Sequence, residues 1–154
     1  MRRLLELRVP PVVLTLVAAS LMWLLARTTP GFVWPRGLRA IVAVTLFAGG
    51  LAVAIFAVRE FRAARTTVNP LQPAAASTMV RSGIYGRTRN PMYLGMVLVL
   101  AAWSVWLASP AAMAVLPVVA VYLDRFQIVP EERALAARFG REFAEYQRSV
   151  RRWL

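Results

Sequence analysis

Polar residues able to bind a charged ligand gather in a short segment, residues 81–95, directly before an apolar stretch. Asn90 stands at a position that can cap a helix, and Pro91 suits the first helical residue. The free backbone N–H groups of such a helix end attract carboxylates and phosphates, and Arg87 or Arg89 could assist. The segment therefore predicts an anion site, although a well-capped membrane helix with snorkelling arginines and interfacial tyrosines explains the same pattern.

Acidic residues mark a second candidate site. Glu131 and Glu132 follow Pro130, an order typical of the first turn of a helix, whose positive end favours carboxylates. Successive helical residues diverge by about 100°, so the two carboxylates are expected to point in different directions. Asp124 and Arg125 lie at the inner end of an apolar stretch, where an ionisable pair is costly unless it snorkels or faces a polar cavity.

Composition limits the chemistry of these residues. The chain has no Cys and no His, which excludes disulfides, thiolate nucleophiles, haem ligation and the usual zinc sites. All nineteen basic residues are Arg, against seven acids, and the net charge is +12. Because this charge lies between apolar blocks, it indicates membrane topology and contact with anionic headgroups rather than a nucleic-acid partner. A bound cofactor, or Arg, Glu, Asp and Tyr side chains, must supply the chemistry, with no metal.

The elements that must position these residues are membrane helices, because 59% of the 154 residues are hydrophobic and occur in long blocks. The blocks predict four spans in two hairpins, at residues 9–26, 38–58, 92–108 and 111–123, the last continuing toward residue 129. The first block is longer than a secretory signal core and lacks a small-residue cleavage pattern, so a retained helix is expected.

A helix of a different kind is predicted at the C-terminal end. Its apolar residues are three or four positions apart, which indicates one apolar stripe on a polar helix: Leu135, Phe139, Phe143, Tyr146 and Val150. Gly140 marks either a break in this helix or a close backbone approach. The sequence thus predicts a single all-α membrane domain, 1–154, made of an N-terminal hairpin (1–58), a loop (59–91), a second hairpin (92–129) and an amphipathic helix (130–154).

Arginine counts predict the orientation of the helices. The 59–91 loop carries six arginines, and six more follow Arg125, whereas the turn at Ser109 and Pro110 has none. By the positive-inside rule, the long loop and both termini are cytoplasmic. The predicted outer loop carries Arg27, Arg36 and Arg39, which weakens this assignment without reversing it. The expected location is a bacterial inner membrane, with the site on the cytoplasmic side.

Three patterns occur in a fixed order between residues 80 and 153: Gly83-x-Tyr85-x-x-x-Arg89-Asn90-Pro91-x-Tyr93-x-Gly95, then Glu131-Glu132-x-x-Leu135-x-x-x-Phe139-Gly140, then Tyr146-x-x-x-Val150. In these patterns the chain resembles the isoprenylcysteine carboxyl methyltransferase and phospholipid methyltransferase superfamily. Residues 1–79 resemble it only as a hydrophobic hairpin. Many relatives have His where this chain has Asn90, and the extra N-terminal helices of eukaryotic members are absent.

The resemblance implies a methyltransferase whose cofactor, S-adenosylmethionine (SAM), lies between the loop before the third helix and the segment from Glu131. It implies a cofactor site formed by Gly83, Tyr85, Arg89, Asn90, Pro91, Tyr93, Leu94, Gly95, Glu131 and Glu132. Arg89 and the helix end could bind the cofactor's carboxylate, one Glu its ammonium or ribose, and a Tyr its sulfonium or adenine. Arg125 and Glu132 are the implied catalytic residues, with Arg125 orienting the acceptor.

The acceptor itself stays open, because a prenylcysteine-like carboxylate, a phospholipid amine and a small hydrophobic thiol all fit a lipid-like or amphiphilic substrate. Two other functions remain. Sterol reductases, which use NADPH, resemble this superfamily through a related C-terminal motif, but they usually have more helices. A non-catalytic membrane scaffold or lipid-binding protein would keep the helices and bind no nucleotide-like cofactor. The sequence does not indicate the oligomeric state.

Overall fold

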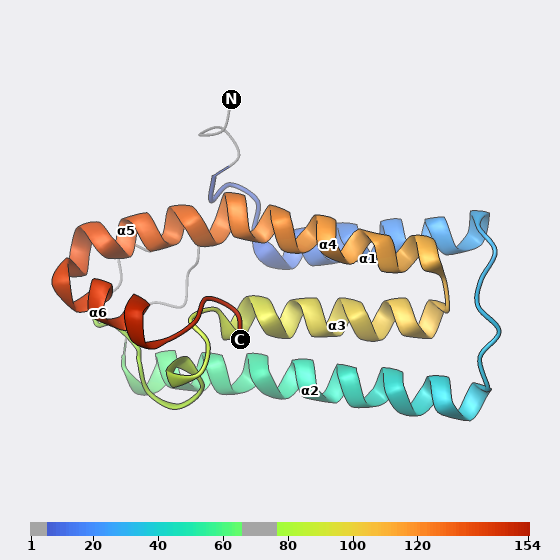
Figure 1. Ribbon diagram of the computed structural model, residues 1–154, viewed down its shortest axis with the longest axis horizontal. Helices are drawn as coiled ribbons and strands as arrows, with labels where there is room; N and C mark the ends of the chain where they lie inside the picture. The colour runs from blue at the N-terminus through green and yellow to red at the C-terminus, as the bar shows by residue number, and fades with distance from the viewer. Residues whose placement is uncertain (1–5, 66–76) are drawn as a thin grey trace.

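The computed structural model describes residues 6–65 and 77–154, and every regular element within these ranges is helical (Figure 1). Residues 66–76, within the predicted 59–91 loop, lie outside the described residues. The helices are α1 (Pro11–Thr28), α2 (Arg36–Ala63), the 3₁₀ turn η3 (Gly83–Gly86), α3 (Pro91–Leu107), α4 (Pro110–Leu123), the π-helical turn η4 (Asp124–Ile128), α5 (Val129–Phe139) and α6 (Arg141–Ser149). The predicted all-α class is confirmed.

Within the described ranges, three helices are long and apolar enough to cross a membrane: α1, α2 and the continuous helix from Pro110 to Phe139. The apolar helix α3 has 17 residues, which corresponds to about 25 Å and is slightly shorter than a bilayer core of about 30 Å. The prediction that the fourth helix continues past residue 123 is confirmed. α2 runs five residues beyond its predicted end at residue 58, because nothing in the sequence of its last turns interrupts a helix.

α3 forms the middle of the molecule, with α2 on one side and with α1 and α4 on the other (Figure 1). α2 and α3 approach closely where two glycines face each other. A Cβ atom on Gly50 would lie 2.8 Å from the carbonyl oxygen of Gly95, and one on Gly95 would lie 2.7 Å from that of Gly50. Small residues allow this close backbone approach between membrane helices, so Gly95 serves helix packing in this structure.

The two adjacent glycines of α2 provide a direct test of this contact. Gly50→Ala is expected to lower the free energy of unfolding by about 1–3 kcal/mol, because its Cβ would overlap backbone atoms of α3. Gly49→Ala is the matched control, since a Cβ there would have no neighbour within 4 Å; it should gain about 0.5–1 kcal/mol. Thermal unfolding in detergent measures both. Equal shifts for the two variants would contradict the packing role.

The N-terminal segment contacts η4, and the C-terminal residues lie beside the start of α3. Leu7 N–H donates to the carbonyl oxygen of Phe126 in η4 at 3.0 Å, which anchors the N-terminal segment. Gly140 has a φ of +51° and separates α5 from α6, so it is the break that the sequence allowed. After α6 the chain runs back to the N-terminal end of α3 (Figure 1), where Trp153 packs against the apolar core.

Candidate active site

A pocket lies among the end of α2, the segment before α3, the start of α3, α5 and α6. Its empty space, including its open mouth, is about 640 Å³. Six of the residues predicted from the sequence line it: Tyr85, Arg89, Asn90, Tyr93, Glu131 and Glu132. Aromatic and apolar side chains complete much of the lining, among them Phe61, Met79, Val80, Met92, Leu135, Phe143 and Tyr146. The structure therefore brings the two polar segments of the sequence into one site.

The other predicted residues lie outside this lining. Pro91 is buried as the first residue of α3, and Leu94 lies one turn into that helix, where its N–H bonds to the carbonyl oxygen of Asn90. Gly95 lies in the contact between α2 and α3. Arg125 is exposed on η4 and does not line the pocket. These residues do not line the pocket in this structure, and their implied roles stay predictions.

Gly83 shapes the turn that carries Tyr85. It has a φ of +56°, and a Cβ atom there would overlap the carboxylate of Glu60, so only glycine fits without strain. The Ser82 hydroxyl donates to the same carboxylate, which joins the turn to the end of α2. The ring of Tyr85 then packs edge-on against Phe61, with 5.2 Å between ring centres. Gly83 thus contributes to the pocket indirectly, through the position of Tyr85.

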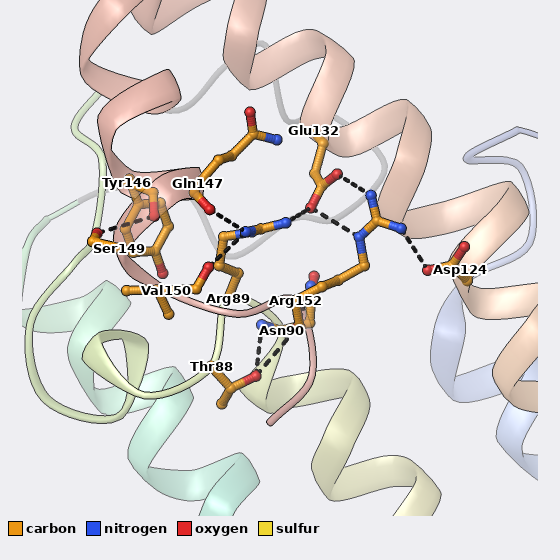
Figure 2. A network of polar contacts seen from close by, with 10 residues as sticks. All are labelled: Thr88, Arg89, Asn90, Asp124, Glu132, Tyr146, Gln147, Ser149, Val150 and Arg152. Carbon is orange, nitrogen blue, oxygen red and sulfur yellow. Dashed lines mark hydrogen bonds and ion pairs between the residues drawn. The ribbon is translucent and has the colours of Figure 1, made fainter.

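Arg89 binds the C-terminal residues rather than standing free in the pocket (Figure 2). Its side chain donates to the backbone carbonyls of Gln147 at 3.0 Å and Val150 at 2.6 Å. It also donates to Glu132 Oε1 at 2.8 Å, and both side chains of this ion pair are nearly buried, at 11% and 12% exposed. The structure thus places Arg89 and Glu132 in direct contact, whereas the sequence suggested opposite ends of a cofactor. Arg89 Nε is buried without a hydrogen-bond partner.

Arg152 completes a chain of charges from the pocket wall to η4 (Figure 2). Its guanidinium donates to both oxygens of Glu132, at 3.2 and 2.7 Å, and to Asp124 Oδ1 at 3.0 Å. The hydrogen bond with Glu132 is the main reason why the pKa of Arg152 is raised. Asp124 thus pairs with Arg152. The sequence had suggested a pair between Asp124 and its neighbour Arg125. Both oxygens of Glu132 are occupied by arginines.

Asn90 does not cap α3 with its side chain, contrary to the prediction from the sequence. Its Nδ2 donates to the carbonyl oxygen of Arg152 at 2.9 Å, and its backbone N–H donates to Thr88 Oγ1 at 3.3 Å. The first N–H groups of α3 therefore have no side-chain cap, and Met92 and Tyr93, which carry them, line the pocket. Such a helix end favours an anion.

Glu131 differs from Glu132 in its partners. Its Oε2 accepts a hydrogen bond from the Tyr93 hydroxyl at 3.1 Å, and no arginine of the described ranges forms an ion pair with it. Arg89 and Arg152 are balanced by Glu132 and Asp124, so Glu131 is the acidic residue of the described pocket lining that has no ionic partner. Because like charges repel and unlike charges attract, this wall is complementary to a cation.

The tyrosines of the pocket remain neutral near pH 7. Burial is the main cause that raises the pKa of Tyr85, and the negative charge of Glu131 adds to it. Burial also raises the pKa of Tyr146 to about 12, against the opposing effect of Arg89 and Arg81. The Tyr146 hydroxyl donates to the carbonyl oxygen of Tyr85 at 2.7 Å. These rings therefore act as apolar, polarisable walls, with π faces that favour a cation.

Comparison with known proteins gives the family of this site. The sequence profile of the phospholipid methyltransferase family matches residues 38–142, about two thirds of the chain. The chain belongs to the phospholipid methyltransferase family. This confirms the superfamily inferred from the sequence, and the match begins at α2, well before residue 80. Membership indicates a SAM-dependent methyltransferase of lipids.

The chain is also similar to an uncharacterized protein of Haemophilus influenzae (strain ATCC 51907 / DSM 11121 / KW20 / Rd). It is 40% identical over 63 residues, which make up 41% of this chain and the whole of that protein. No solved structure matches the chain.

Reasoning from the sequence missed several residues of the site. Arg152 lies beyond the part of the chain that matches the phospholipid methyltransferase family, and nothing distinguishes it from the other arginines of the tail. Glu60 lies at the end of a long apolar helix, where a charge suggests only the membrane surface. Phe61 lies next to Glu60, and nothing in the neighbouring sequence indicates that it lines a pocket. The repeat of apolar residues in α6 did reveal Phe143 and Tyr146, which are both buried.

Proposed function

We propose that this protein transfers a methyl group from SAM to the amine of a phospholipid. The observation that carries this proposal is the uncompensated carboxylate of Glu131 in an aromatic pocket beside the uncapped start of α3. Family membership supports the reaction class. The pocket offers a negative wall and a positive helix end, and SAM has an ammonium and a sulfonium as well as a carboxylate.

The residues present fit the cofactor. Glu131 would meet the ammonium or a ribose hydroxyl, and the N–H groups of Met92 and Tyr93 would meet the carboxylate. The rings of Tyr85 and Tyr146 would face its adenine or sulfonium. Bound SAM supplies an electrophilic methyl group that already carries its leaving group. We assign Arg89 and Glu132 to holding the C-terminal residues beside the pocket, because their groups are engaged there.

The main task of the protein residues is to position the reactants and to exclude water. Holding the acceptor in line with the methyl group can supply about 7–11 kcal/mol of the barrier. Phe61, Leu135 and Phe143 give the pocket apolar walls that favour this exclusion. The C-terminal residues, held by Arg89 and Asn90, lie against the start of α3 and fix its position relative to α5.

The charge of the pocket favours an amine acceptor. Its only arginine among the described lining residues, Arg89, is already paired, so an acceptor carboxylate would find no free cation there. Arg125, exposed at the end of the membrane helix, is the proposed contact for the phosphate of the lipid.

Transfer of a labelled methyl group to lipid extracts, separated by headgroup, identifies the acceptor. Label found in a carboxyl ester or a thioether would contradict an amine acceptor.

Binding of S-adenosylhomocysteine tests the proposed cofactor without requiring the acceptor. A ligand that binds only the folded protein adds RT ln(1 + [L]/Kd) to its stability, about 2.7 kcal/mol at one hundred times Kd. We expect S-adenosylhomocysteine to raise the unfolding temperature of the protein in detergent and NADPH to leave it unchanged. A shift with NADPH and none with S-adenosylhomocysteine would support a reductase. If neither ligand shifts the unfolding temperature, a non-catalytic protein is supported.

The arginine distribution supports a cytoplasmic pocket in a bacterial inner membrane. Because the native chain has no Cys, a single cysteine placed at Ser77 reports the side of this loop. Labelling of that cysteine only from the outside would refute the orientation.

A further inference from the structure

A second hollow lies between α1 and α2, at the end of the bundle opposite the pocket. Leu100 and Trp103 of α3 form its floor, Leu16 of α1 lines one side, and Val44 and Phe47 of α2 line the other. Its empty space, including the open side, is about 920 Å³. The hollow exists because α1 and α2 pack on different sides of α3 (Figure 1). We call it the lateral groove.

The lateral groove covers part of the depth of one leaflet. Its lining on α3 runs from Val99 to Trp106, which corresponds to about 10 Å of helix. Half of a bilayer core is about 15 Å. Leu16 and Val44 are 63% and 65% exposed, so the groove opens sideways toward lipid. The groove can therefore hold about two thirds of an acyl chain that lies parallel to α3 and spans this leaflet core.

Two arginines mark the outer end of this region. The guanidinium carbon of Arg39 lies 5.4 Å from the ring centre of Trp106, which lines the groove. The Nε atom of Arg39 is buried without a hydrogen-bond partner. Arg27 lies 4.7 Å from the ring of Trp23, which lines an adjoining hollow that shares Trp103 with the groove.

The start of α2 adds to this positive charge. Its N-cap position, Pro35, provides no side-chain cap, and the first N–H groups of a 28-residue helix favour an anion. Arg39 lies in this first turn, and it is the arginine of the turn that contacts the ring of Trp106. The groove therefore combines an apolar channel with a cationic end at membrane depth, as the two parts of an anionic lipid require.

We propose that the lateral groove binds an anionic glycerophospholipid of the leaflet opposite the methyl-transfer pocket. One acyl chain lies over Trp103, and the phosphate binds at Arg39 and the start of α2. A second copy of the chain is a poorer occupant, because each copy brings a net charge of +12. This lipid is not a methyl acceptor, since Tyr93 in the pocket and Trp106 are separated by thirteen residues of α3, about 20 Å. The inference is independent of the proposed function.

Tryptophan fluorescence tests this proposal, because Trp103 and Trp106 line the groove and brominated acyl chains quench a tryptophan that they touch. Delipidated protein in an uncharged detergent is titrated with phosphatidylglycerol or with phosphatidylcholine, both carrying brominated chains. Phosphatidylglycerol is expected to reach half-quenching at a concentration about fivefold or more below that of phosphatidylcholine, given the usual contribution of one arginine near an anionic lipid.

Three variants locate the effect. Arg39→Gln should remove the preference for phosphatidylglycerol, whereas Arg36→Gln, which removes the same charge from an exposed position of the same turn, should keep it. Val44→Phe should narrow the groove and weaken quenching by both lipids with Arg39 intact, so the proposal does not depend on the folding of one variant. Equal quenching by the two lipids in the wild type would overturn it. So would an equal loss in Arg36→Gln and Arg39→Gln, or a delipidated dimer protected from both lipids.

Discussion

Glu131→Gln is expected to reduce the affinity for S-adenosylhomocysteine by about tenfold to a hundredfold while the protein folds normally. The carboxylate of Glu131 is the one charge of the pocket without an ionic partner among the described residues. A hydrogen bond to a charged group contributes about 1.5–3 kcal/mol to binding, which equals this loss of affinity. Isothermal titration calorimetry in detergent measures it directly.

The free energy of unfolding of Glu131→Gln should equal or exceed that of the native protein. Gln retains an oxygen that can accept the hydrogen bond of the Tyr93 hydroxyl, which is 3.1 Å from the carboxylate in the native protein. The substitution also removes a charge that is largely withdrawn from water, a change that costs no stability and can increase it. A variant that folds as well as the native protein but binds the ligand weakly would identify Glu131 as a binding residue.

Glu145→Gln is the matched control for this experiment. It removes the same charge from an exposed position of α6, where Glu145 pairs with Arg141 on the surface. Its affinity for S-adenosylhomocysteine should equal that of the native protein. If Glu131→Gln also binds normally, the negative wall does not hold the ligand, and the assignment of the cation to Glu131 is wrong.

The helices of this protein could be predicted from the sequence because their signals are local. Apolar blocks gave the membrane helices to within a few residues, except that α2 ends five residues later than predicted. Gly140 signalled a break, and its positive φ shows why the chain turns there. Glu131 and Glu132 were recognised as suited to a helix start, and the family resemblance implied their place in the site. Each of these signals lies within a few neighbouring residues.

The contacts that build the site could not be predicted, because they join residues far apart in the chain. Nineteen arginines look alike in the sequence, yet Arg89 and Arg152 share one carboxylate whereas Arg125 is exposed on η4. Asn90 was expected to cap its own helix, but a backbone carbonyl of the C-terminal residues takes its side chain instead. The family resemblance implied a cofactor role for Gly95, and only the structure reveals that Gly50 lies opposite it. Pairings of this kind depend on the fold.

The ion pairs of Glu132 with Arg89 and Arg152 give the largest expected effect on the free energy of unfolding. Glu132→Gln should lower the free energy of unfolding by about 3 kcal/mol or more, because it leaves the nearly buried Arg89 without its ionic partner. Arg152→Gln should cost about 1 kcal/mol or less, since the Arg152 side chain is 36% exposed and water screens its charge. Thermal and denaturant unfolding in detergent compare the two variants. The exposed pair of Arg81 and Glu142 is the control, and Glu142→Gln should stay within about 1 kcal/mol of the native protein.

A double-mutant cycle of Arg89→Gln and Glu132→Gln then separates the ion pair from other losses. Arg89 donates through Nη1 to the C-terminal carbonyls and through Nη2 to Glu132. Both single variants lose the ion pair, so their losses in the free energy of unfolding should not add. The coupling energy should lie between about 0.5 and 3 kcal/mol. Variants that still fold should keep most of their affinity for S-adenosylhomocysteine, since both oxygens of Glu132 already bind arginines. If Glu132→Gln instead unfolds like the native protein and loses affinity as strongly as Glu131→Gln, then Glu132 binds the cofactor directly and the charge chain opens when the ligand enters.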